Sequence, residues 1–186
     1  MRIIGGKYKG KKIFLPIDHN TRPLRSLVKE SIFNLISHSK KFDCSINNSE
    51  ILDLFSGTGS FGLECLSRNS KKITFFENYT KALHVLKKNI KMLKFENKCE
   101  IIDEDCFKFF KIKKTFKFKF DIIFMDPPYK EKKINLLIDL ILTKKILKND
   151  GILIIHRHKK DNIRISDKIK ILDERIYGIS KIIIGN

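Results

Sequence analysis

The feature that most constrains the fold of this chain is a glycine-rich segment that follows a short apolar run. Ile51 and Leu52 lead into the sequence DLFSGTGSFG at residues 53–62, and a helix-like stretch comes next. Glycine tolerates positive φ and lets a ligand approach the backbone closely. A strand, a glycine-rich turn and a helix in this order begin a nucleotide-binding α/β unit. The segment therefore predicts an α/β fold with a ligand site at the end of its first strand.

A second apolar run, residues 72–77, ends in an acidic residue, Glu77. A carboxylate at this place can accept both ribose hydroxyls of an adenosine cofactor, although a solvent-facing strand end is the alternative. The glycine spacing also fits G-x-G-x-x-G, which is weak evidence for a dinucleotide. Asp53, just before the loop, would repel a pyrophosphate and attract the methionine ammonium of S-adenosylmethionine. The residues therefore favour S-adenosylmethionine over NAD.

From residue 50 onward, apolar runs alternate with amphipathic stretches. Strands are expected near 50–54, 72–77, 99–103, 120–126 and 151–156, and helices near 60–68, 80–94, 105–111 and 132–147. The strands are apolar on both faces, as in a parallel sheet that helices cover. Residues 168–176 and 180–184 are expected to close the sheet as an antiparallel hairpin that turns at Tyr177-Gly178. The pattern predicts a doubly wound, mostly parallel, seven-stranded sheet of Rossmann-like type.

The strongest indication of a reaction is a tetrapeptide that directly follows the apolar run at 120–125. It consists of Asp126, Pro127, Pro128 and Tyr129. An exocyclic amine on a planar base is a poor nucleophile, because its lone pair is delocalised into the ring. The Asp126 carboxylate and a carbonyl held by the prolines could accept its N–H bonds, and Tyr129 could stack on the ring. An ordinary chain stop at the two prolines is the alternative. The tetrapeptide predicts an amine-methylating site.

The third expected strand ends among acidic residues, Asp103, Glu104 and Asp105. In an adenosine-binding fold, an acid here can accept the adenine amino group. We select Asp105, which Cys106 follows as an apolar residue for the adenine pocket, with Asp103 as the competitor. A helix N-cap is the alternative role for either aspartate.

The net charge of the chain, +18, predicts a polyanionic partner, and nucleic acid is the first candidate. Lysine, isoleucine and asparagine are all abundant, so an AT-rich genome could account for part of this charge. No cysteine or histidine spacing suggests a metal site, and the cysteine pattern fits a reducing cytoplasm best. No apolar stretch suffices to span a bilayer. Residues 156–159, His-Arg-His-Lys, are expected to form an exposed basic patch.

The first 48 residues precede the α/β pattern and are expected to form a basic extension. Residues 1–15 alternate apolar pairs with glycines and lysines, which predicts a β-hairpin, and residues 26–38 have helical periodicity. The polar loop at 39–49 is the expected boundary, so the chain divides into an extension, 1–48, and a main domain, 49–186. We expect the extension and the basic loop at 113–119 to grip RNA phosphates. The residues selected in the extension are Arg2, Lys7, Lys9, Lys11, Arg22 and Arg25.

Nearly the whole chain resembles one family, the RsmD-type bacterial 16S rRNA guanine-N2 methyltransferases, within the class I S-adenosylmethionine-dependent enzymes. The similar segments are the opening RIIGG…KG, Thr21-Arg22-Pro23, residues 28–34, residues 53–68, the tetrapeptide at 126–129, and Tyr177-Gly178. The chain departs from the pattern at Leu24 and Arg25, at Lys29, where the family usually has arginine, and at His156, where it usually has glutamate.

The resemblance implies a role for each matched residue. Asp53, Phe55, Gly57, Gly59 and Glu77 would hold the methionine and ribose parts of the cofactor, and Asp105 and Cys106 would lie by the adenine. Asp126 and the Pro127 carbonyl would accept from a guanine amine, and Tyr129 would stack on the base.

The expected partner is 16S rRNA or a small-subunit particle, and the chain is expected to act as a cytoplasmic monomer without a metal. Two alternatives stay open: an adenine-N6 methyltransferase of DNA or RNA, because the tetrapeptide is shared with such enzymes, and a non-catalytic rRNA-binding assembly factor.

Overall fold

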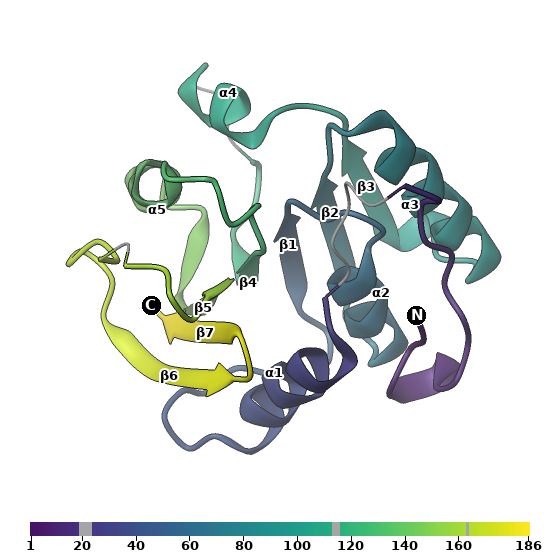
Figure 1. The fold of residues 1–186 in the computed structure, drawn as a ribbon, viewed down its shortest axis with the longest axis horizontal. Helices are drawn as coiled ribbons and strands as arrows, with labels where there is room; N and C mark the ends of the chain where they lie inside the picture. The colour runs from purple at the N-terminus through teal and green to yellow at the C-terminus, as the bar shows by residue number, and fades with distance from the viewer. Residues whose placement is uncertain (19–23, 113–115, 163) are drawn as a thin grey trace.

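The computed structural model describes residues 1–18, 24–112, 116–162 and 164–186, and a single twisted sheet forms its centre (Figure 1). The strands have the order β3-β2-β1-β4-β5-β7-β6. The first five are parallel, and β7 runs antiparallel to both of its neighbours. Their bounds are β1 Glu50–Leu54, β2 Lys72–Phe76, β3 Cys99–Ile102, β4 Phe120–Met125, β5 Leu147–His158, β6 Ile171–Tyr177 and β7 Ser180–Gly185. The predicted mostly parallel, seven-stranded sheet is confirmed.

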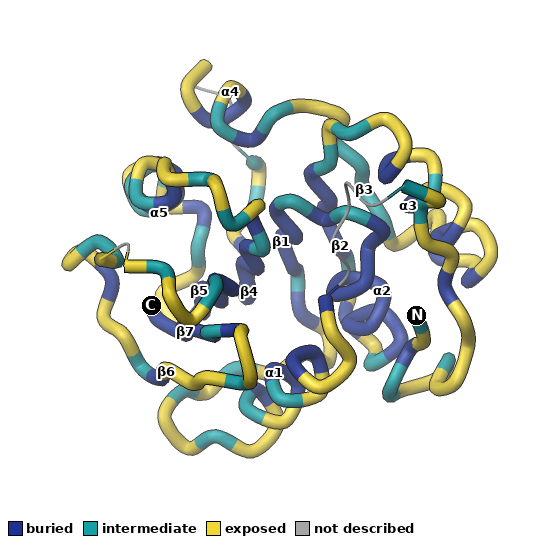
Figure 2. Tube along the Cα trace, in the orientation of Figure 1, coloured by how far each residue is buried: buried dark blue, intermediate teal, exposed yellow. Residues whose placement is uncertain are grey.

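Helices cover both faces of the sheet, as the two-sided apolar strands require. The helices are α1 Ser26–His38, α2 Ser60–Ser67, α3 Thr80–Met92, α4 Cys106–Lys111 and α5 Ile134–Thr143, and the short 3-10 turns are η1 Gly6–Tyr8 and η2 Glu96–Lys98. Side chains of β4 alternate between two core clusters: Ile122 and Phe124 pack with α1, α2 and α3, and Ile123 and Met125 pack with α4 and α5. Figure 2 shows the strands buried in the middle of the molecule.

The boundary between α5 and β5 differs from the expectation of a helix to residue 147 and a strand from 151. The helix ends at Thr143, and β5 begins at Leu147. Lys145 has a left-handed φ of 51°, Ile146 N–H donates to the Ile141 carbonyl, and Lys145 N–H donates to Leu142. This pattern of bonds is a Schellman motif, which ends a helix. The apolar run across it belongs to two elements.

The first residues form a loop closed by one antiparallel bridge, Arg2 with Lys12, around the turn η1, rather than a regular two-stranded hairpin. Ile3 and Ile13 are buried in the same core cluster as the inward face of α1 and the sheet. In the described residues 1–18 and 24–48, the buried apolar side chains of the extension therefore share one core with the strands.

Candidate active site

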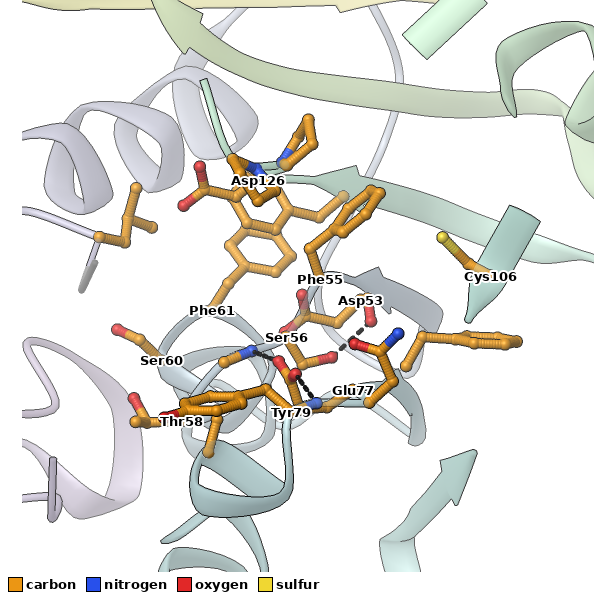
Figure 3. Close-up of a pocket in the computed structure, with 18 of the residues that line it drawn as sticks. Asp53, Phe55, Ser56, Thr58, Ser60, Phe61, Glu77, Tyr79, Cys106 and Asp126 are labelled. Atoms are coloured by element: carbon orange, nitrogen blue, oxygen red, sulfur yellow. Dashed lines mark hydrogen bonds between the residues drawn. The ribbon is translucent and has the colours of Figure 1, made fainter. Parts of the chain in front are cut away.

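A pocket of about 690 Å³ lies where β1, β2 and β4 end. Because parallel strands place their carboxyl ends at one edge of a sheet, residues that follow these strands meet there. The register pairs Leu54 with both Phe76 and Met125, so Phe55, Glu77 and Asp126 come next at one level. In Figure 3 Asp126 lies on one side of the pocket and Glu77 on the other, with Asp53 and Phe55 between them in this view. The chain order reverses between β1 and β4, which is the switch point where ligands bind in open α/β sheets.

The glycine-rich loop has the backbone conformations that its sequence suggested. Gly57 and Gly59 have φ of 56° and 81°, and the carbonyl of Ser56 accepts from Gly59 N–H. A Cβ on Gly59 would come within 2.5 Å of Leu86. Phe55 is also left-handed, with φ of 62°, an uncommon and strained state for a bulky side chain that clusters at functional sites. Phe55 and Gly57 line the pocket, whereas Gly59 lies behind it as the N-cap of α2.

Glu77 is hydrogen-bonded to the glycine-rich loop. One carboxylate oxygen accepts from Gly57 N–H at 2.6 Å and the other from Tyr79 N–H at 2.8 Å (Figure 3). Burial raises the pKa of Glu77, and backbone N–H groups that include Asn78 lower it. Tyr79, which the sequence did not single out, lines the pocket and donates its hydroxyl to Asp18. Glu77 thus faces the pocket instead of ending its strand in solvent.

Asp53 is 1% exposed and lies beneath the loop. Its carboxylate accepts from Gly62 N–H, in the first turn of α2, at 3.0 Å. Burial raises the pKa of Asp53 well above its ordinary value; the Gly62 N–H lowers it, and the nearby Asp126 and Glu77 carboxylates raise it further. The carboxyl groups of Asp53, Glu77 and Asp126 repel each other, so the site favours a ligand that brings positive charge.

At the end of β3, Asp105 takes the alternative role, that of a helix N-cap. It caps α4, and its side chain accepts from Lys108 N–H at 3.0 Å. Asp105 also lines the pocket, as does Cys106, whereas Asp103 is exposed and is not among the lining residues. Burial raises the pKa of the Cys106 thiol to about 12, so the thiol stays protonated at neutral pH.

The whole tetrapeptide lines the pocket. Pro127 is buried, Asp126 and Tyr129 are half-buried, and Pro128 is exposed. The Tyr129 ring makes edge contacts with the rings of His156 at 6.1 Å and His158 at 5.0 Å between centroids. The tetrapeptide therefore ends β4 inside the pocket and packs on the end of β5.

The expectation of an exposed basic patch at residues 156–159 is wrong for its first half. His156 and Arg157 are each 2% exposed. Arg157 donates to the carbonyls of Pro128, Tyr129 and Glu131 at 3.0–3.2 Å and pairs with Asp161. The end of β5 is thus a buried support for the tetrapeptide, which the alternation of polar residues could not reveal.

The basic residues selected for RNA contact lie on the surface where the structure describes them. Arg2, Lys7, Lys9, Lys11 and Arg25 are exposed, and Arg22 lies outside the described residues, as does the 113–115 part of the basic loop.

Lys29 does not join this basic surface. It is fully buried, pairs with Glu64 at 3.3 Å and donates to the Arg2 carbonyl. Burial lowers the pKa of Lys29, and the Glu64 carboxylate opposes this effect. Lys29 therefore ties α1 to the first residues and to α2.

Asn89 is a further buried polar residue that sequence reasoning missed. Its amide oxygen accepts from Phe14 N–H at 2.7 Å, and its amide nitrogen donates to the carbonyls of Phe14 and Thr58, both at 3.1 Å. Thr58 lines the pocket, so Asn89 ties the extension to the glycine-rich loop.

Among residues 1–18, 24–112, 116–162 and 164–186, the side chains form no cluster of three or more metal-ligating groups. No helix within those ranges is long and apolar enough to cross a membrane.

Comparison with known proteins covers the whole chain. The family described as Conserved hypothetical protein 95 matches residues 1–186. The chain is 37% identical over 161 residues to ribosomal RNA small subunit methyltransferase D of Buchnera aphidicola subsp. Acyrthosiphon pisum, which covers 87% of this chain and 80% of that protein. It is 32% identical over 180 residues to the protein of the same name from Haemophilus influenzae, which covers 96% of this chain and 90% of the relative.

Solved structures agree with these relatives. A putative methylase from Haemophilus influenzae superposes with a TM-score of 0.78 at 30% identity, over 99% of this chain and 96% of that one. A putative methyltransferase from Escherichia coli, at 24% identity, has the same fold with a TM-score of 0.82 over 100% of this chain and 96% of the other. The resemblance seen in the motifs is confirmed, and the chain belongs to the ribosomal RNA small subunit methyltransferase D family.

Proposed function

We propose that this protein transfers a methyl group from S-adenosylmethionine to the exocyclic N2 amine of a guanine in the 16S rRNA of the small ribosomal subunit. The observation that carries the proposal is that one pocket brings together the glycine-rich loop, Glu77 and the whole Asp126–Tyr129 tetrapeptide. The acidic residues that line the pocket indicate a cationic ligand. The net charge of +18 on the chain as a whole indicates that a polyanion binds elsewhere on the surface. The names of the relatives support an rRNA substrate.

The lining residues fit S-adenosylmethionine. Its ammonium and sulfonium charges would offset the repulsion among Asp53, Glu77 and Asp126, and Glu77 would accept from the ribose hydroxyls. The free lone pairs of Asp105 would accept from the adenine amine, beside the uncharged Cys106 thiol. The volume of about 690 Å³ lies within the range of small-molecule and cofactor sites.

When bound, the cofactor supplies an electrophilic methyl group. The chain then has to orient the amine and accept its proton. Asp126 and the Pro127 carbonyl would accept the two N–H bonds of the amine, and Tyr129 would stack on the base. Most of the acceleration would come from positioning, for which effective molarities are very large. Taking the guanine out of its helix or loop costs a few kcal/mol and is easier in unpaired RNA.

Cofactor affinity is expected to rise with pH. Burial raises the pKa of Asp53, and a bound cation favours the ionised carboxylate. The pKa is therefore lower in the complex than in the free protein, so binding releases a proton below the free-protein pKa and the affinity levels off above it. Titration calorimetry from about pH 5 to about pH 8, in buffers of different ionisation enthalpy, measures both the affinity and the proton released.

Asp53→Asn is the matched variant for this experiment. This variant should bind the cofactor at least about tenfold more weakly than the wild type. Its affinity should also depend less steeply on pH, and the dependence that is left should come from Glu77, whose pKa is also raised. A wild-type affinity that is flat over this range, or equal slopes in the two proteins, would contradict the assignment of Asp53.

RNA affinity is expected to depend on the exposed lysines of the extension. Replacing Lys7, Lys9 and Lys11 together by alanine should weaken binding and reduce the slope of log K against log salt by roughly 0.7 for each phosphate that the variant no longer neutralises. Cofactor affinity should not change. The control replaces three exposed lysines elsewhere, Lys87, Lys91 and Lys98, and lowers the net charge equally. Equal salt slopes in the two triple variants would show that net charge alone acts.

The decisive test of function uses methyl-labelled S-adenosylmethionine and small-subunit particles that lack endogenous modification, followed by mapping of the label. Label on a guanine N2 supports the proposal. Label on an adenine N6 of RNA or duplex DNA favours the alternative amino methyltransferase, because the tetrapeptide suits both amines. Failure to bind the cofactor at all favours an rRNA-binding assembly factor. We expect the active species to be a monomer, which sedimentation of the enzyme can verify.

A further inference from the structure

His156 lies directly behind the acid of the tetrapeptide. Met125 pairs with Ile155 in the parallel β4–β5 ladder, so Asp126 and His156 follow at the same level. The Nδ1 atom of His156 is 2.8 Å from the Oδ1 atom of Asp126. Asp126 lines the pocket, whereas His156 is buried and is not among the lining residues. Any effect of His156 on a ligand must therefore act through residues that it contacts, Asp126 by a hydrogen bond and Tyr129 by a ring contact.

The chemistry of the two groups decides which way this hydrogen bond runs. An ionised carboxylate only accepts hydrogen bonds, so Nδ1 of His156 must carry the hydrogen. The other ring nitrogen, Nε2, is buried and has no hydrogen-bond partner within the described part of the chain. A hydrogen on Nε2 would be an unsatisfied buried donor, whether or not Nδ1 also carries a hydrogen. The surroundings thus favour a neutral ring with its hydrogen on Nδ1.

The next residue, Arg157, holds the backbone of the same segment. Its guanidinium donates to the carbonyls of Pro128, Tyr129 and Glu131. Neighbouring residues of a strand point to opposite faces of the sheet. His156 and Arg157 therefore contact the tetrapeptide from opposite faces at the end of β5. Arg157 fixes the course of the chain, and His156 contacts the carboxylate that the chain carries.

We propose that His156 is a positioning residue for methyl transfer, which donates its Nδ1–H to Asp126 and so fixes the rotation of that carboxylate. This inference rests on the proposed function, in which Asp126 accepts from the substrate amine. The remaining lone pairs of a carboxylate point in directions set by its rotation, and a misdirected acceptor costs rate without costing binding. A hydrogen-bond donor at the Nδ1 position is thus required, and an imidazole as such is not.

Two substitutions separate the donor from the ring. His156→Leu removes the donor and keeps an apolar side chain in the buried space, so kcat should fall about tenfold or more while the KM for RNA and the cofactor affinity change less than about threefold. His156→Asn places an amide N–H near the former Nδ1 and should recover kcat to within about threefold of wild type. His38→Asn, on the exposed end of α1, is the matched control and should leave kcat unchanged. Thermal melting verifies that each variant is folded.

A second readout needs neither RNA nor turnover. Long-range nitrogen–proton NMR spectra of histidine-labelled protein resolve the ring form of each of the five histidines, and His156→Asn assigns the signal of His156. The expected form is the neutral Nδ1–H tautomer at neutral pH. The Nε2–H tautomer, or equal kcat losses in folded His156→Leu and His156→Asn, would overturn the proposal, as would wild-type kcat in His156→Leu. If the wild-type protein methylated no guanine, the proposed function would fail while the spectrum still decided the state of His156.

Discussion

Asp126→Ala is expected to lower turnover on small-subunit RNA by at least about 100-fold. The variant removes the carboxylate that is proposed to accept an N–H of the amine and to receive its proton. This interaction strengthens as the amine attacks, so the loss should fall on kcat, and the cofactor affinity should change less than about threefold. Single-turnover methylation and calorimetry of cofactor binding measure the two quantities separately.

Asp126→Asn is the matched variant, because it keeps the shape and one oxygen acceptor but loses the negative charge. Turnover between those of the wild type and Asp126→Ala would indicate that orientation and charge both contribute. A folded Asp126→Ala protein with near wild-type turnover would show that the tetrapeptide does not act as a clamp on the amine.

Glu64→Leu is expected to lower the free energy of unfolding by about 3–5 kcal/mol, because it breaks a buried ion pair from one side. Glu64 accepts from Ile4 and Gly5 N–H, both at 2.7 Å, and pairs with Lys29 and Arg68. The Lys29 and Glu64 side chains are both 0% exposed. The variant would leave the Lys29 ammonium buried without its carboxylate and two amides without their acceptor. The free energy of unfolding of a typical domain is roughly 5–15 kcal/mol, so this loss would be a large part of it.

Urea denaturation at constant pH measures this loss, and two further variants interpret it. Lys29→Met combined with Glu64→Leu should recover part of the stability, because no uncompensated charge then stays buried. Glu100→Gln breaks the surface ion pair with Lys72, in which the Lys72 side chain is 36% exposed and the Glu100 side chain 43%. This variant should lower the free energy of unfolding by less than about 1 kcal/mol. If Glu64→Leu cost no more than Glu100→Gln, the extension would not depend on the buried pair.

Local patterns predicted the elements that carry the pocket. The periodicity at residues 26–38 matches α1 residue for residue, and the apolar run at 50–54 matches β1. Parallel strands end at one edge, so the prediction that Phe55, Glu77 and Asp126 serve one site needed only the order of the strands. The break between α5 and β5 was missed, because Lys145 adopts a left-handed conformation that its residue type does not suggest.

The supports of the pocket could not be predicted in the same way. His156 and Arg157 follow an apolar run as polar residues, a pattern typical of a strand that leaves the core. Glu64 lies in α2 among small and apolar residues, and a single charge on a helix usually faces water. Each is buried because its hydrogen-bond partner comes from a distant part of the chain. His156 contacts Asp126 and Arg157 donates to the Pro128 carbonyl. Glu64 accepts from the N–H groups of Ile4 and Gly5.

The class of fold, the family and many of the pocket residues, among them Asp53, Glu77 and Asp126, can be recognised from the sequence alone. Glycine conformation, strand periodicity and the chemistry of an acid beside prolines are properties of short segments, so they can be recognised one segment at a time. Which polar residues are buried to hold those segments in place depends on tertiary packing. The burial of a charged or polar side chain depends on a partner that offsets its loss of hydration, and such partners meet only when distant strands and helices pack together.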